Sequence, residues 1–238
     1  MGFLAIPWRR FRRFVLPLRC LLCNASGEHD IDLCSACAAE LPRNSSCCAR
    51  CALPLAVPAA LCGECLRSQP PWDAAWAPFR YGWPLDRLES RYKFSSDLAA
   101  GRVLSTLWQR ERPPLNLPQL LLTVPLHRSR LRRRGYNQAL ELARPLARSL
   151  GLPLRHDALL RRRSTTAQTE LDAIARRRNV HGAFVLREGV ALPAHVAILD
   201  DVMTTGATLA ECARVLRRGG VQRIDVWALA RAPSRRNE

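Results

Sequence analysis

Apolar positions between residues 73 and 238 fall into two alternating patterns. Four short apolar runs predict buried strands, at 76–81, 120–124, 195–199 and 224–229. Four stretches with helical spacing predict helices, at 85–92, 97–109, 136–150 and 207–218. Pro145 interrupts the third of these helices and predicts a kink there. Strands that alternate with helices predict an α/β fold, an open parallel sheet flanked by helices with right-handed crossovers.

Residues 1–72 follow neither pattern and are rich in cysteine and proline. Pro70 and Pro71 stiffen the chain at the end of this region and predict a boundary. A chain of 238 residues has room for one domain of ordinary size and a small module. We therefore expect an N-terminal module at residues 1–72 and a larger α/β domain at residues 73–238.

Eight of the ten cysteines form four C-x-x-C pairs: Cys20/Cys23, Cys34/Cys37, Cys48/Cys51 and Cys62/Cys65. This spacing lets a tight turn present two sulfurs to one tetrahedral ion, usually Zn²⁺. The gap between the first and second pair recurs between the third and fourth, which predicts two ribbon-like half-modules with four thiolates each. A single zinc ion and interleaved pairing are the alternatives. Cys47 is expected beside the ligands rather than among them, and Cys212 is expected in the apolar core.

The stretch 196–208 joins an apolar run to two carboxylates and a hydroxyl-rich loop. Asp200 and Asp201 follow the run, where open α/β sheets place ligands. The next residues lead directly into a predicted helix and offer backbone amides, hydroxyl groups and the positive end of a helix dipole: Thr204, Thr205, Gly206, Ala207 and Thr208. These groups suit a phosphate monoester, and the carboxylates suit vicinal sugar hydroxyls or a hydrated Mg²⁺. A sugar phosphate is the predicted ligand, and an ordinary strand with a capped helix is the alternative.

Two further loops carry clustered arginines. The first follows the predicted strand at 120–124, and arginine forks with free amides suit a diphosphate. There we expect backbone contacts from three residues and a side-chain contact from a fourth: Pro125, Leu126, His127 and Arg128. The second, at 161–169, is basic and unpatterned and predicts a lid over a charged reaction centre, with Arg161 and Arg163 screening the leaving group. A solvated surface loop is the alternative for both.

The formal charge of the chain is +17, and Lys93 is the single lysine among 37 basic residues. Eight thiolates on two Zn²⁺ add eight negative and four positive charges, which lowers the net charge to about +13. A polyanionic partner is still expected at that charge. No run reaches the roughly 18 apolar residues of a membrane span. Arginines interrupt the apolar N-terminus, unlike in a signal peptide. We expect a cytoplasmic protein whose N-terminus packs on the rest of the chain, or else lies on the inner face of the membrane.

Taken together, the motifs resemble those of the ComF family. Besides the paired cysteines, the chain carries Val-Pro-Leu-His, Arg-Gly-Tyr-Asn-Gln, Thr165-x-x-Gln168, Arg176-x-x-Asn179-Val180, Gly-Ala-Phe at 182–184 and the stretch 196–208, in the family's order. That last stretch is similar to the phosphoribosyl diphosphate (PRPP) fingerprint of type I phosphoribosyltransferases. In those enzymes the acidic pair contacts ribose hydroxyls, the Thr-Thr-Gly loop binds the 5-phosphate, and the loop after the earlier strand binds pyrophosphate. Ala175 and Pro145 depart from the family pattern, and Ala175 removes an acidic residue usual at that position.

The resemblance implies a type I phosphoribosyltransferase-like domain that binds PRPP with Mg²⁺, joined to a structural zinc module. It also implies a role in natural competence, in which imported single-stranded DNA is passed into the cytoplasm together with a helicase. Two functions follow from this. The protein is either a phosphoribosyltransferase whose acceptor the sequence does not identify, or a non-catalytic adaptor for DNA or a helicase whose PRPP pocket senses a metabolite.

Overall fold

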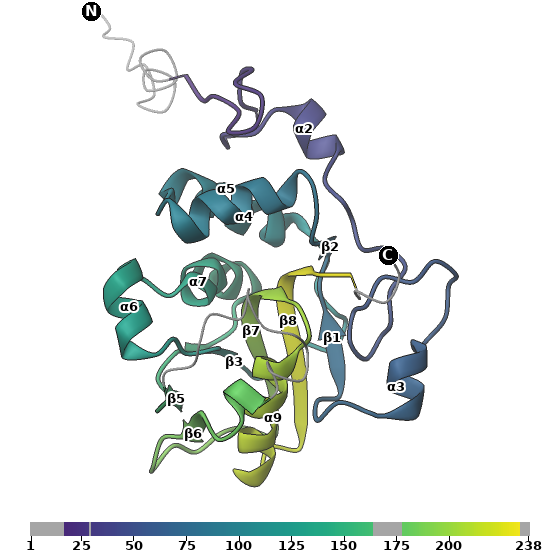
Figure 1. The fold of residues 1–238 in the computed structure, drawn as a ribbon, viewed down its shortest axis with the longest axis vertical. Coiled ribbons are helices and arrows are strands. Elements are labelled where there is room, and N and C mark those ends of the chain that lie inside the picture. The colour runs from purple at the N-terminus through teal and green to yellow at the C-terminus, as the bar shows by residue number, and fades with distance from the viewer. Residues whose placement is uncertain (1–16, 29, 164–177, 234–238) are drawn as a thin grey trace, which may run out of the picture.

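The computed structural model describes residues 17–28, 30–163 and 178–233 (Figure 1). Its centre is a six-stranded sheet in the order β1-β8-β7-β3-β4, with β2 also paired to β8. The strands are β1 (Ala74–Trp76), β2 (Phe79–Arg80), β3 (Leu120–Thr123), β4 (Leu154–Arg155), β7 (His195–Met203) and β8 (Arg223–Arg231). Each neighbouring pair in this sheet is parallel, which confirms the predicted open parallel sheet.

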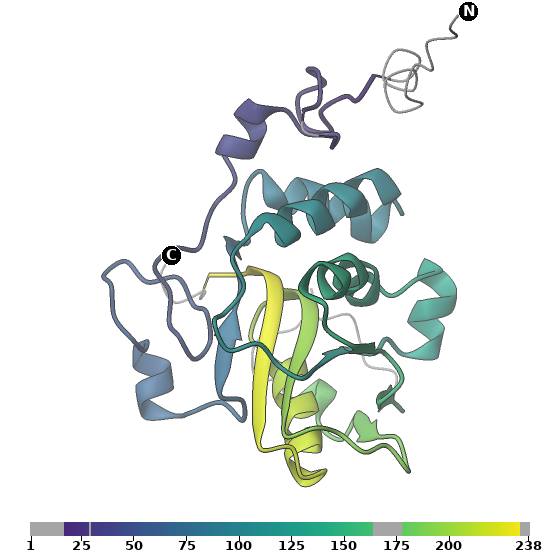
Figure 2. The same ribbon diagram turned by 180° about the vertical axis from the view of Figure 1, so that it is seen from behind.

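Both faces of the sheet are covered (Figures 1 and 2). One face carries the helices α4 (Leu85–Phe94), α5 (Leu98–Arg110) and α7 (Gln138–Leu150). The other face carries α9 (Ala207–Arg218) and an antiparallel hairpin of β5 (Leu159–Arg161) and β6 (Phe184–Leu186). In β7, Leu199 belongs to the core on the α4 side and Ile198 to the core on the α9 side. Successive residues of a strand point to opposite faces, so the apolar run in β7 is buried on both.

The cysteine-rich region is built into both of these cores. Its first half contains α2 (Ser35–Ala39), and Leu33 and Leu41 join the core of α4, α5 and α7. Its second half contains α3 (Gly63–Arg67), and Cys48 and Cys65 join the core of α9 and β7. The two halves therefore contribute to cores on opposite faces of the sheet, and in Figure 1 α2 lies beside α5 whereas α3 lies beyond β1.

The main helices agree closely with the amphipathic pattern. α9 occupies the predicted residues, α4 extends its predicted range by two residues, and α5 begins and ends one residue later than predicted. α7 begins two residues later than predicted because the side chain of Asn137 caps it by accepting from the amide of Ala139, and Pro145 lies inside it. None of the helices in the described ranges is long and apolar enough to cross a membrane. The apolar N-terminus at 1–16 lies outside those ranges.

Three segments differ from the predicted elements. The predicted strand at 76–81 is two short strands, β1 and β2, which pair with successive parts of β8. The arginine-rich segment at 128–134 forms the helix α6 (Arg128–Arg134) rather than an open loop. Arginine is a good helix former, the ring of His127 caps the first turn, and Gly135 ends the helix at φ +80°. β7 runs four residues past its predicted end at 199 because Met203 still pairs with Arg231.

Candidate functional site

The carboxyl ends of β3 and β7 bring the predicted site loops to one edge of the sheet. Thr123 is in register with Leu199, so the segment 125–128, which follows β3, lies level with the acidic pair near the end of β7. The chain passes from β3 to the outer strand β4 and from β7 to β8 on the other side. The connections thus diverge between β3 and β7, and the crevice at such a point is where α/β sheets bind ligands.

Gly206 shapes the predicted phosphate loop at the start of α9. It adopts φ +72° and acts as the N-cap of the helix. A Cβ at this position would lie 2.9 Å from the ring of Trp72 and 3.1 Å from Cε of Met203. The side chain of Thr205 accepts from the amide of Ala207 at 3.4 Å. Glycine is therefore required for both the conformation and the space, and the amides of the first turn of a twelve-residue helix remain at the edge of the sheet.

Arg231, the last residue of β8, holds the start of this loop by hydrogen bonds. Its guanidinium is buried and donates to the carbonyl oxygens of Met203, at 3.1 Å, and Thr204. Its Nε donates to the carbonyl oxygen of Cys51 at 3.0 Å. One side chain thus joins the phosphate loop to the second cysteine cluster. A cavity of about 440 Å³ lies at this junction, bordered by the loop, by α9 and by the segment around Trp72.

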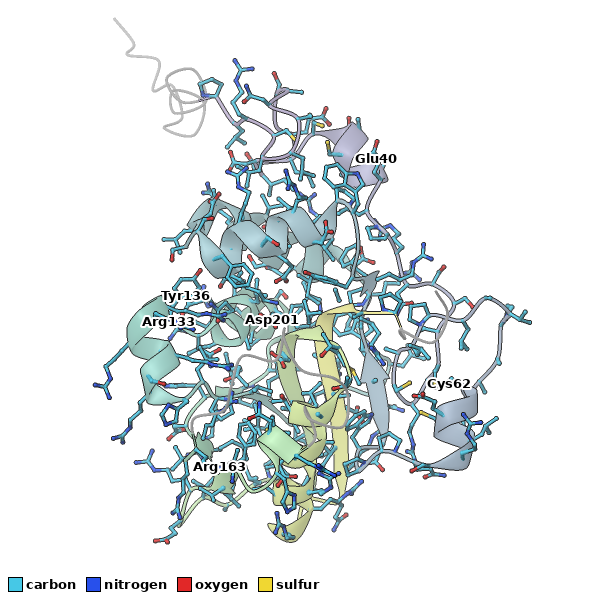
Figure 3. The ribbon with its side chains drawn as sticks, in the orientation of Figure 1. Glu40, Cys62, Arg133, Tyr136, Arg163 and Asp201 are labelled. Carbon is cyan, nitrogen blue, oxygen red and sulfur yellow. The ribbon has the colours of Figure 1, made fainter. Side chains whose placement is uncertain are left out.

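The acidic pair lies within β7 and has a basic partner from α4. Nζ of Lys93 is 3.1 Å from Oδ2 of Asp201 and 3.1 Å from Oε2 of Glu89. Oδ1 of Asp201 accepts from the amide of Val202 at 2.6 Å. Glu89 is completely buried, whereas the side chain of Asp201 keeps 14% of its exposure. Figure 3 shows Asp201 near the upper end of β7, in the same half of the molecule as Tyr136.

These groups shift one another's pKa values. Burial, followed by the charge of Asp201, raises the pKa of Asp200 well above its usual range. Burial also acts to raise the pKa of Asp201, but the charge and the hydrogen bond of Lys93 outweigh it and hold that pKa below the usual value. Burial raises the pKa of Glu89 to about 7, against the opposing effect of Lys93. Asp201 is thus the ionised member of the pair.

The raised pKa of Glu89 predicts a pH-dependent stability difference. Because the folded protein holds this proton more tightly than the unfolded chain, Glu89 contributes stability below its ordinary pKa of 4.5, and that contribution is lost as the pH rises through about 7. From about pH 5 to about pH 8, we expect wild-type protein to lose about 2 kcal/mol of unfolding free energy relative to Glu89→Gln. Urea unfolding of both proteins at matched pH and saturating zinc measures this difference. A difference that does not change with pH would contradict the assignment.

The predicted pyrophosphate loop lies beside a second cavity. Pro125, Leu126, His127 and Arg128 all line this space of about 780 Å³, which extends to α7 and β5. Asn137 donates to the carbonyl oxygen of Val124 at 3.0 Å and so ties the end of β3 to the start of α7. Arg128 is exposed, as a residue that contacts a diphosphate from solvent needs to be. The structure therefore gathers these four residues at one cavity.

The two predicted lid residues lie in different surroundings. Arg161 is the last residue of β5, is 9% exposed and lies with its guanidinium 5.3 Å from the ring centroid of Phe184. Arg163 is exposed and donates to the carbonyl oxygen of His181 at 2.9 Å. Thus Arg161 belongs to a strand of the hairpin rather than to the expected unpatterned loop at 161–169, and residues 164–169 of that loop lie outside the described residues.

The eight paired cysteines form two clusters. Cys20, Cys23, Cys34 and Cys37 make up the first, and Cys48, Cys51, Cys62 and Cys65 make up the second. Within each cluster the Sγ atoms lie within 4.8 Å of one another, as four thiolates around one tetrahedral Zn²⁺ require. This confirms the predicted grouping into two half-modules. Cys47 lies outside both clusters, and Cys212 is completely buried in the core, as expected.

Three residues of the site are absent from the sequence prediction: Lys93, Glu89 and Arg231. Each left a signal in the chain. Lys93 is the single lysine in a chain of arginines, and Glu89 occupies a position on the apolar stripe of α4. Arg231 ends β8 directly after the apolar run at 226–230. These signals mark the residues as unusual, but only the folded chain shows which groups they meet.

Comparisons with known proteins identify two regions of the chain. The double zinc ribbon domain matches residues 11–66, and the phosphoribosyl transferase domain matches residues 137–238. The chain is 37% identical to DNA utilization protein YhgH of Escherichia coli over 225 residues, which cover 91% of this chain and 98% of that protein.

Two competence proteins are also similar. Competence protein F of Haemophilus influenzae is 39% identical over 176 residues, which cover 71% of this chain and 77% of that protein. Competence protein ComFC of Streptococcus pneumoniae is 26% identical over 155 residues, which cover 65% of this chain and 67% of that protein. With its double zinc ribbon, its phosphoribosyltransferase domain and this similarity along most of its length, the chain belongs to the ComF family of competence and DNA utilization proteins.

Proposed function

We propose that the protein binds PRPP with Mg²⁺ at the carboxyl edge of its sheet and transfers the phosphoribosyl group to an acceptor. The main support is the continuity of β7 and α9. The acidic pair lies in the partly exposed part of β7 that follows its buried run, and the amide-rich loop that starts the helix follows within a few residues. A sugar phosphate presents hydroxyls and a phosphate at a similar spacing, so one segment of chain can hold both.

Each predicted site residue has a role in this proposal. The loop at 204–208 anchors the 5-phosphate through the amides of the first helical turn and through its hydroxyl groups. Asp200 and Asp201 form hydrogen bonds with the ribose hydroxyls, and the ionised Asp201 stabilises the positive charge that develops on the sugar as the bond to pyrophosphate breaks. The acceptor supplies the electron pair for the new bond, so no nucleophile of the protein is needed.

The leaving pyrophosphate is assigned to the loop at 125–128. Amides of this loop and the side chain of Arg128 bind its oxygens, and Arg161 and Arg163 keep their predicted role of screening it. The carboxylate oxygens of the acidic pair are ligands that suit Mg²⁺. When bound, Mg²⁺ supplies a Lewis acid that neutralises charge on the diphosphate. In this proposal residues 73–238 carry the phosphoribosyl site and residues 1–72 carry the zinc module.

The phosphate loop gives a direct test of PRPP binding. Gly206→Ala introduces a Cβ into contact with Trp72 in a backbone conformation that alanine rarely adopts. We expect it to weaken Mg²⁺–PRPP binding at least tenfold, by roughly 1–3 kcal/mol of backbone strain and displaced amides. Titration calorimetry on zinc-loaded protein measures this affinity.

Gly220→Ala is the matched control for that test. Gly220 has φ +89°, so the backbone strain is similar, but a Cβ there meets nothing within 4 Å and the residue lies at the far end of α9. We expect it to retain the wild-type affinity. Wild-type protein that gives no heat with Mg²⁺–PRPP would overturn the proposed function. Equal losses of affinity in Gly206→Ala and Gly220→Ala would show that the loop at 204–208 does not bind the 5-phosphate.

A second function is supported by the names of the relatives and by the charge of this chain. One relative is named for competence and another for DNA utilization, and a net charge of +17 favours a polyanion. We propose that the protein also binds single-stranded DNA, with a helicase as a further partner. Fluorescence anisotropy with an oligonucleotide at rising salt tests this, because phosphate contacts lose affinity steeply with salt. PRPP turnover across a panel of nucleobases distinguishes an enzyme from an adaptor that only senses PRPP.

A further inference from the structure

The single lysine of the chain lies inside the proposed ribose site. Lys93 contacts carboxylates from two elements, Glu89 on its own helix and Asp201 on β7. Its side chain is only 18% exposed. All the other residues among the lysines and arginines of this chain are arginines, so a compact ammonium occurs at this position alone. Such a group can meet two carboxylates at once without the width of a guanidinium.

The buried carboxylate of Glu89 argues against a purely stabilising role for this cluster of charges. α4 buries one stripe of residues, Leu85, Leu88, Glu89 and Tyr92, so the carboxylate occupies a core position. Oε1 of Glu89 is buried and accepts no hydrogen bond from any described residue. Buried ion pairs are often no more stabilising than apolar residues of similar size. A charge cluster in the core beside a ligand-binding edge is more typical of a functional site.

The contacts of Asp201 show what the cluster does. Its Oδ1 accepts from the amide of Val202 and its Oδ2 from Lys93, so both oxygens are held in place. Each carboxylate oxygen has a second lone pair, which leaves both able to accept from a ligand. The ammonium of Lys93 alone would cancel the negative charge of Asp201. Glu89 adds a carboxylate behind the ammonium and offsets that effect whenever it is ionised.

We propose that Lys93 and Glu89 are positioning residues of the ribose site. Lys93 holds Asp201 ionised and in the orientation that accepts hydrogen bonds from the ribose hydroxyls, and Glu89 holds Lys93. This inference rests on the proposed function and extends it, since it assigns to α4 a part in recognising the sugar rather than the phosphate. The residues act through Asp201 and do not themselves contact the ligand.

Two probe ligands separate the sugar from the phosphate. Ribose 5-phosphate carries both the hydroxyls and the phosphate, whereas ethyl phosphate carries only the phosphate. We expect Lys93→Met, which keeps an apolar stem and removes the charge, to bind ribose 5-phosphate about tenfold more weakly and to bind ethyl phosphate with wild-type affinity. We expect Glu89→Gln to lower the affinity for ribose 5-phosphate about threefold. Calorimetric titration of zinc-loaded protein with each ligand measures these changes.

Arg91→Met is the matched control on the same helix. Arg91 pairs with Asp97 at 2.8 Å and donates to the carbonyl oxygen of Leu21, so its loss removes comparable contacts away from β7. We expect this variant to bind both ligands normally. Circular dichroism checks that each variant is folded, and Glu89→Gln, which keeps the shape of the side chain, carries the test if Lys93→Met does not fold.

Two results with Lys93→Met would overturn the inference. Lys93→Met with unchanged affinity for ribose 5-phosphate would show that Asp201 needs no partner. An equal loss of both ligands would show that Lys93 only supports the fold. If Lys93→Met does not fold, the test depends on Glu89→Gln. The inference is then overturned if this variant binds ribose 5-phosphate with unchanged affinity, or if it loses affinity for both ligands equally. Wild-type protein that binds neither ligand nor Mg²⁺–PRPP would remove the proposed function itself, and that result is distinct because it appears before any variant is made.

Discussion

The Asp201→Asn variant is expected to bind Mg²⁺–PRPP about 100-fold more weakly than wild-type protein. The substitution keeps the size of the side chain but removes a charge that accepts hydrogen bonds from sugar hydroxyls, and one or two charge-assisted hydrogen bonds account for about 3 kcal/mol. It also leaves the ammonium of Lys93 beside a neutral amide, so the site turns more positive where a cation and a developing positive charge are expected. Titration calorimetry gives the affinity.

Asp225→Asn is the control for this variant. Asp225 is also a nearly buried aspartate of the central sheet with basic partners, since it lies 3.0 Å from His195 and 3.2 Å from Arg223. However, it lies near the amino end of β8, level with Ala197 and away from the site. We expect it to lower stability and to leave PRPP affinity unchanged. Equal losses in the two variants would show that the effect of Asp201 is structural.

The Asp201→Asn variant also separates the two proposed functions. If single-stranded DNA binds to the basic surface by its phosphates, removing one carboxylate at the sheet edge should leave the affinity for DNA nearly unchanged. Anisotropy with the same protein preparation measures this alongside the calorimetry. A variant that loses both PRPP and DNA to the same extent would indicate a single shared site rather than two.

Local pattern predicts much of this fold. The helix α9 is found at its predicted residues because its start and end depend on nearby chemistry, with Gly206 before it and Gly219 after it. The cysteine clusters are equally predictable, because four C-x-x-C turns can be paired by spacing alone and metal geometry allows few arrangements. The phosphate loop could be located because it lies between a strand and a helix that the apolar pattern predicts.

The remaining features depend on contacts that are distant in the sequence. β7 continues through the acidic pair because β8 offers partners up to Arg231, which no pattern within 195–203 reveals. Lys93 lies more than 100 residues before Asp201, and their contact depends on how α4 crosses the sheet. The arginines at 128–134 form α6, where the sequence pattern predicted an open loop that binds a diphosphate. Tertiary context determines the extent of β7 and the contact of Lys93, whereas α6 depends on helix propensity and capping within residues 127–135.

Loss of the second zinc site is expected to weaken PRPP binding far more than loss of the first. Cys34 and Cys62 are equivalent residues, since each is the third ligand of its cluster and the N-cap of the short helix that follows. Figure 3 shows Cys62 beside α3. We expect Cys34→Ser and Cys62→Ser each to lose one of the two zinc ions. We expect Cys62→Ser to lower Mg²⁺–PRPP affinity at least tenfold and Cys34→Ser to change it by less than about threefold.

The reason for this difference is the packing of the two halves. The second cluster shares a core with α9, and the carbonyl oxygen of its Cys51 is held by the same Arg231 that holds Met203 and Thr204. The first cluster contributes to the core on the other face, with α4 and α5. Release of zinc from the second site therefore frees a support of the phosphate loop, whereas release from the first does not. Similar losses in both variants would show that zinc acts only on overall stability.

Thermodynamic linkage extends this prediction in the opposite direction. If zinc at the second site strengthens PRPP binding, then PRPP must strengthen zinc binding at that site by the same factor. Saturating Mg²⁺–PRPP is therefore expected to shift the chelator concentration that removes the second zinc ion upward by about tenfold or more, and to leave the first nearly unchanged. Chelator titrations of Cys34→Ser and Cys62→Ser, each holding a single zinc ion, measure the two sites separately. A shift that is equal in the two variants would exclude a specific route through Arg231, because only the second cluster contacts that residue among those described.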